Sequence, residues 1–201
     1  IPSHLQSEDL PARLVSAIDE IATNAEVAAG VCGAVHNQRT IDAALTLRDN
    51  LGAAETLLRD LSPYGHPQFQ AARTATPMII EVDADRSELH RAERFGPVAF
   101  IIPVKDSYQA LGLAVRDAAQ CGAIATYAYT TNEAYRNRVE DELFAAGASV
   151  GFNLIRHRPM NYTAAFSDYH VTGLNPAGNA SLTDLAFVAN RFRIVQSKTE
   201  V

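Results

Sequence analysis

In the second half of the chain, three apolar runs of strand length alternate with two stretches of helical periodicity. The runs cover residues 98–104, 123–129 and 148–153, and Gly122 and Gly147 end the helical stretches before the second and third runs. Strand, helix and strand in succession favour a right-handed crossover between parallel strands. The pattern therefore predicts an α/β fold with a mostly parallel sheet flanked by helices.

The first half of the chain predicts further elements around this sheet. Apolar residues at helical spacing indicate helices over residues 7–24 and 40–49, and apolar runs indicate strands over residues 55–61 and 76–82. Residues 25–35 are small and apolar around two glycines, and are expected to form a tight connection. A charged loop is expected after the second of these strands.

Polar residues at three helix starts are expected to be caps. Thr40 is expected to cap the helix over residues 40–49. Either Asp106 or Ser107 is expected to cap the first helix of the alternating region. Thr130 and Glu133 have the spacing of a capping box for the second helix of that region.

The composition excludes several classes of function. The chain has 201 residues, which suits one domain, and a formal charge of −6. Binding of nucleic acid needs clustered Lys and Arg, so this charge argues against it. No apolar run has the length of a membrane span, residues 1–30 lack a signal-peptide pattern, and the two cysteines are far apart. We expect a cytoplasmic protein that binds neither nucleic acid nor a membrane.

One short motif stands where the charged loop turns into the strand at residues 98–104. It reads Glu93, Arg94, Phe95, Gly96, Pro97, Val98. Gly supplies backbone freedom and Pro cannot pair inside a sheet, so a turn is expected there. The turn would hold a carboxylate and a phenyl ring at the carboxyl edge of the parallel sheet, where α/β proteins bind ligands. The alternative is a plain turn with a solvated Glu.

The motif Glu-x-Phe-Gly-Pro-Val before an apolar strand resembles the nicotinamide-side motif of the aldehyde dehydrogenase superfamily. The resemblance implies that Glu93 binds the ribose next to the nicotinamide and that Phe95 packs near the ring. It also implies NAD or NADP as cofactor and a small aldehyde as substrate. In the family the aldehyde forms a thiohemiacetal, a hydride passes to the nicotinamide, and hydrolysis releases the acid.

Two later segments extend the resemblance. Residues 147–153 resemble a Gly-x-Val-x-x-Asn region of the family, which places Asn153 beside the active site. Residues 187–197 resemble the tail of phenylacetate-degradation enzymes of the PaaN type. By that resemblance the strand expected over residues 191–198 joins the sheet of a partner subunit in a homodimer or tetramer.

Residues 156–179 form a polar segment without periodicity, and long irregular segments in compact domains are often functional. We interpret this segment, which contains Tyr162 and His170, as lining a substrate pocket together with Asn153. A solvated loop packed on the sheet edge is the alternative. The family's Pro-Phe-Gly-Gly loop is absent after Asn153, which implies a pocket of unusual shape.

The family's nucleophile stands in a Gly-Gln-x-Cys context that this chain lacks. Cys32 lies among small apolar residues and too close to Glu93 to match the family spacing, and Cys121 is expected in the core. We therefore assign no catalytic residue and interpret residues 1–201 as the C-terminal part of a catalytic domain, inactive alone. The catalytic Cys, the general-base Glu and an N-terminal cofactor-binding domain, which would decide between NAD and NADP, are expected outside it.

Two other classes of function stay open. One is a free-standing, non-catalytic α/β module for binding or assembly, and the other is a self-contained hydrolase that uses Cys32. A metal enzyme is not predicted, because the six histidines form no i, i+4 pair and no cluster with cysteine.

Overall fold

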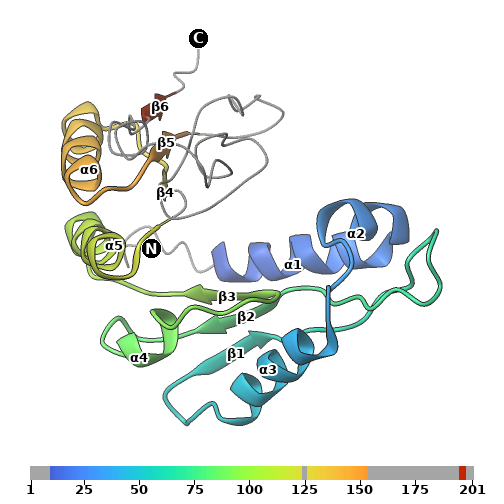
Figure 1. Cartoon of the computed structure of the whole chain (residues 1–201). Helices are drawn as coiled ribbons and strands as arrows, with labels where there is room; N and C mark the ends of the chain where they lie inside the picture. Colours follow the sequence, from blue (N-terminus) through green and yellow to red (C-terminus); the bar gives the residue numbers. More distant parts are fainter. Residues whose placement is uncertain (1–9, 124–125, 154–194, 198–201) are drawn as a thin grey trace, which may run out of the picture. The chain divides into compact units, whose positions relative to one another are not determined.

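A computed structural model of the chain describes residues 10–123, 126–153 and 195–197. The chain divides into two compact units, Ile1–Ala110 and Leu111–Val201. Each unit contains a three-stranded sheet (Figure 1). Each also has an apolar core of its own.

The sheet of the first unit has the order β1-β2-β3. Its strands are β1 (Thr56–Arg59), β2 (Met78–Glu81) and β3 (Val98–Ile101). Strand β1 runs antiparallel to β2, whereas β2 and β3 are parallel, with Met78 opposite Val98.

Two helices cover opposite faces of this sheet (Figure 1). Ile79 points to one face and packs with Ile18 of α1 (Leu10–Thr23). Its neighbours Met78 and Ile80 point to the other face and pack with α3 (Gln38–Asp49). All three β2 side chains are at most 1% exposed, which follows from the alternation of side chains along a central strand. The first unit is therefore a sheet between two helical layers.

The second unit is built on a parallel sheet of the order β4-β5-β6. Its strands are β4 (Thr126–Ala128), β5 (Val150–Phe152) and β6 (Val195–Ser197). Helix α6 (Glu133–Ala145) connects β4 to β5. The core combines buried residues of α5 (Ser107–Cys121), α6 and β5, among them Leu111, Ala118, Val139, Leu143 and Phe152.

The predicted α/β class is confirmed, and three of the four described strand pairs are parallel. The strands of the alternating region are divided between two sheets, however, since β3 pairs with β2 and β4 pairs with β5. Alternation of strands and helices predicts strand direction, but it does not decide which strands become neighbours. Within the predicted C-terminal strand, residues 195–197 pair with β5 of the same chain, and the other residues lie outside the described ranges.

The tight connection predicted after the first helix is wrong, because α2 (Ala25–Val31) occupies it. The side chain of Asn24 starts this helix by accepting hydrogen bonds from the backbone N–H groups of Glu26 and Val27, at 3.1 and 3.2 Å. A one-turn helix, α4 (Ser87–His90), also lies within the predicted charged loop.

Two of the three predicted caps are also wrong. Asn37 caps α3 and Asn132 caps α6, through side-chain oxygens that accept from Thr40 N and Tyr135 N at 3.1 and 3.0 Å. The third predicted cap is confirmed, since Asp106 Oδ1 accepts a hydrogen bond from the backbone N–H of Gln109, the third residue of α5, at 2.8 Å.

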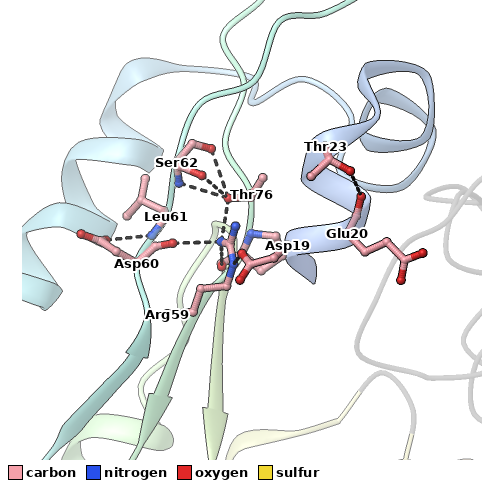
Figure 2. Close-up of polar contacts among 9 residues, drawn as sticks. Asp19, Glu20, Thr23, Arg59, Asp60, Leu61, Ser62 and Thr76 are labelled. Carbon is pink, nitrogen blue, oxygen red and sulfur yellow. Dashed lines mark hydrogen bonds and ion pairs between the residues drawn. The ribbon is translucent and has the colours of Figure 1, made fainter. Parts of the chain in front are cut away.

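A buried guanidinium ties α1 to the sheet of the first unit (Figure 2). The side chain of Arg59 is 8% exposed, and its Nε lies 2.8 Å from Asp19 Oδ1 of α1. One terminal nitrogen of Arg59 donates to Thr76 Oγ1 at 2.7 Å and to the carbonyl of Pro77 at 2.8 Å. Thr76 is fully buried and also bonds Ser62, so the cluster fixes the chain that enters β2.

Candidate functional site

A cleft of about 440 Å³ lies in the first unit, between the first turns of α3 and the loop that enters β3. Helix α3 and this loop contribute residues that are far apart in the sequence. The cleft is lined by Asn37, Arg39, Thr40, Ala43, Ala44, Glu93, Arg94, Phe95 and Val98.

The two residues singled out in the motif, Glu93 and Phe95, line this one cleft. The Glu93 side chain is exposed, and the Phe95 ring is 76% exposed. An accessible carboxylate can accept hydrogen bonds from hydroxyl groups, and an accessible ring can pack on a flat ligand. The cleft thus offers one polar and one aromatic contact within a volume typical of small-molecule sites.

Gly96 and Pro97 hold the loop against α3 and the sheet. Gly96 has a φ of +156°, and a Cβ atom there would lie 3.2 Å from Cγ2 of Thr40 in α3. The carbonyl of Pro97 accepts a hydrogen bond from Met78 N at 2.7 Å, which continues the pairing of β2 and β3. The conformation and the close approach to α3 both explain a glycine at this turn.

The cleft does not lie at the carboxyl edge of the parallel strands, so that expectation is wrong. The loop precedes β3, and the parallel register of Met78 with Val98 places it at the amino ends of β2 and β3. Of the three strands of this sheet, the antiparallel β1 alone has its carboxyl end at this edge, since Arg59 pairs with Ile79. A segment that leads into a strand is necessarily joined to its amino end.

Asn153 lies in the second unit, directly after β5, with a φ of +52°. Its side-chain oxygen accepts from Thr130 N at 2.9 Å, and its side-chain nitrogen donates to the Thr130 carbonyl at 3.0 Å. Asn153 N also donates to the carbonyl of Ala128 at 2.9 Å. Asn153 therefore joins the carboxyl ends of β4 and β5.

Removing this amide is expected to destabilise the second unit. Asn153→Ala should lower the free energy of unfolding by about 2–3 kcal/mol, since it removes two hydrogen bonds and strains a residue with positive φ. Asn153→Gly removes the same bonds without the strain and should cost about 1 kcal/mol less. Urea denaturation measures both, and equal losses would contradict a contribution from the backbone conformation.

The other predicted pocket residues, Tyr162 and His170, lie with the whole segment 156–179 outside the described residues. Cys121 is exposed, so its predicted place in the core is wrong. It is the last residue of α5 and lies beyond Ala118, the last buried residue of that helix.

Cys32 is the partly exposed C-cap residue of α2. The Tyr64 hydroxyl donates a hydrogen bond to the carbonyl of the adjacent Gly33. Burial raises the pKa of Tyr64, and a negative charge on Cys32 would raise it further. A phenol held neutral in this way is an ineffective base for activating the thiol.

Comparison with known proteins identifies the family. The model of the aldehyde dehydrogenase family matches residues 6–178, which is most of the chain. The chain belongs to the aldehyde dehydrogenase family. The fold agrees with this family, because a crystal structure of the NAD-dependent aldehyde dehydrogenase from Burkholderia multivorans superposes with a TM-score of 0.69 at 34% sequence identity.

This superposition covers 92% of the present chain and 33% of the Burkholderia dehydrogenase, so the chain spans about a third of that protein. A search of curated proteins found no significant match. None of the helices formed by the described residues is long and apolar enough to cross a membrane. Within the same residues, no three His, Cys, Asp or Glu side chains are grouped as metal ligands would be.

Within this aldehyde dehydrogenase chain, the sequence pattern identified only one side of the cleft. Glu93 and Phe95 belong to a short motif that can be read locally. Asn37, Arg39 and Thr40 come from the start of α3, which packs on the sheet, and the close approach of Gly96 to Thr40 completes the contact with the motif. No pattern in the sequence signals that contact.

Proposed function

We propose that this chain forms the part of an NAD(P)-dependent aldehyde dehydrogenase catalytic domain that receives the nicotinamide end of the cofactor. The observation that carries the proposal is the shared cleft of Glu93 and Phe95, the two residues of the family motif. The NAD dependence of the similar Burkholderia enzyme supports NAD in particular.

The side chains in the cleft fit one end of a dinucleotide. The exposed carboxylate of Glu93 can accept hydrogen bonds from both hydroxyls of a ribose, and the exposed ring of Phe95 can pack on the flat nicotinamide. The chain has no Gly-x-Gly-x-x-Gly sequence to cradle the phosphates. The bound cofactor would supply the hydride acceptor, and Glu93 and Phe95 would orient it.

We further propose that the nucleophilic Cys, the general base and most of the cofactor-binding domain lie outside these 201 residues. The absence of a Gly-Gln-x-Cys sequence and the coverage of 33% of the similar enzyme support this. The whole enzyme would be a cytoplasmic homodimer or tetramer that binds a small aldehyde. Its place in phenylacetate or other aromatic catabolism rests on the resemblance of residues 187–197 to PaaN-type enzymes.

Substitutions in the cleft should weaken binding of nicotinamide mononucleotide, the nicotinamide half of the cofactor. Glu93→Gln should raise the dissociation constant about tenfold, because a neutral amide with one acceptor oxygen replaces a charged acceptor with two. Phe95→Leu should raise it several-fold, because the aromatic contact is lost. Glu88→Gln is the matched control, since Glu88 is an exposed acid in α4 and outside the cleft. Calorimetric titration measures all three, and unchanged binding in both cleft variants would refute the proposal.

The chain alone is expected to show no NAD(P)-dependent oxidation of aldehydes. Cys32→Ser should leave this result and the folding of the chain unchanged. Turnover that disappears in Cys32→Ser would instead support a self-contained enzyme with Cys32 as nucleophile.

A further inference from the structure

Arg94 stands between the two motif residues, lines the cleft with them and makes two contacts of its own. One terminal nitrogen of its guanidinium donates to the carbonyl of Ala92 at 2.9 Å. The guanidinium carbon lies 5.7 Å from the centroid of the Phe100 ring. This distance is within the range of a cation–π contact.

These contacts link the loop to a fixed part of the sheet. Phe100 belongs to β3, lies opposite Ile80 of β2 and packs against the apolar core below α3. The hydrogen bond from the Arg94 side chain to the Ala92 carbonyl bridges the backbone across Glu93. The Arg94 side chain therefore restrains the loop from Ala92 to Arg94 and attaches it to β3.

We propose that Arg94 is a positioning residue, whose guanidinium lies over the Phe100 ring and holds the Ala92 carbonyl so that Glu93 and Phe95 stay directed into the cleft. The inference rests on the proposed function, because it assigns a role in binding the nicotinamide half of the cofactor. It also gives Phe100 a role beyond the core.

An arginine side chain can make both contacts of Arg94 at once. A planar guanidinium can stack on a ring with its face while an N–H at its edge donates to a carbonyl. A lysine ammonium has no such plane and would keep only one of the two contacts. Arg94→Lys should therefore recover only part of what Arg94→Met loses, although it keeps the positive charge.

Two measurements on the 201-residue chain test this. Hydrogen exchange of a peptide covering residues 91–98 should be faster in Arg94→Met, and exchange in β2 should be unchanged. The dissociation constant of nicotinamide mononucleotide should rise about fivefold in Arg94→Met and in Phe100→Leu, which removes the ring. Phe100→Tyr keeps a ring and is the matched control, expected to bind as the wild type does.

The double variant Arg94→Met/Phe100→Leu should bind about as weakly as Arg94→Met alone, because Phe100→Leu removes a contact that Arg94→Met has already removed. Exchange at residues 91–98 that is unchanged in Arg94→Met, or fully additive losses of affinity, would overturn the role of Arg94. Failure of the wild type to bind nicotinamide mononucleotide would instead overturn the proposed function on which this role rests.

Discussion

Replacing Gly96 by alanine is expected to weaken binding of nicotinamide mononucleotide at least tenfold and to lower the free energy of unfolding by about 2–3 kcal/mol. Gly96 has a φ of +156°, which side chains rarely tolerate, and the new Cβ would lie 3.2 Å from Thr40 Cγ2. Relief of the contact requires the loop and the Thr40 side chain to move apart by a few tenths of an ångström, and relief of the strain requires the loop backbone to change its conformation. That movement would open the cleft and displace Glu93 and Phe95 together.

Two controls separate the causes of this effect. Thr40→Ser removes the Cγ2 atom and keeps the hydroxyl, so adding it to Gly96→Ala should restore part of the stability. Gly112→Ala changes a glycine inside α5 where a new Cβ would meet no neighbouring atom within 4 Å, and should be neutral or slightly stabilising. Urea denaturation and titration of the nucleotide measure the effects. Wild-type affinity in Gly96→Ala would show that the close contact with α3 does not set the cleft.

Replacing Arg59 by leucine is expected to lower the free energy of unfolding by about 2–4 kcal/mol. The guanidinium is almost fully buried and bonds the Thr76 hydroxyl and the Pro77 carbonyl just before β2 (Figure 2). Leucine leaves the carbonyl of Pro77 without this donor. The ion pair that holds α1 is lost as well.

Asp19→Asn provides the matched control, because it weakens the ion pair from the other side. The Asp19 side chain is 59% exposed, so its loss should cost less than about 1 kcal/mol. Chemical denaturation of both variants tests the difference. Equal losses would mean that the surface ion pair, and not the buried hydrogen bonds, carries the contribution of Arg59.

The sequence predicted elements well where a local pattern decides them. The apolar runs that became β2 and β3 lie within the predicted ranges, and Gly122 and Gly147 follow α5 and α6 with φ values of +78° and +85°. The prediction of a connection at residues 25–35 failed because a side chain outweighs the backbone preference of the glycines there. Asn24 begins a helix in a segment whose glycines favoured a connection, because its side chain satisfies two N–H groups.

The candidate site was predictable only in part, for a physical reason. Glu93 and Phe95 could be identified because the chemistry lies within one short motif. The wall formed by α3 depends on the packing of this helix on the sheet and on a contact between Gly96 and Thr40, and no periodicity in the sequence reports which helix lies beside the motif. The order of strands in the sheets is likewise set by packing between distant segments.

The proposed role of the cleft beside Glu93 and Phe95 is to receive the nicotinamide half of the cofactor. It is tested most directly by an NMR titration of the ¹⁵N-labelled chain with nicotinamide mononucleotide, and with adenosine monophosphate in parallel. We expect the nicotinamide nucleotide to shift amide signals of residues 37–44 and 93–98, the segments that line the cleft, and the adenine nucleotide to leave them unchanged. Shifts confined to other residues, or equal shifts from both nucleotides, would contradict it.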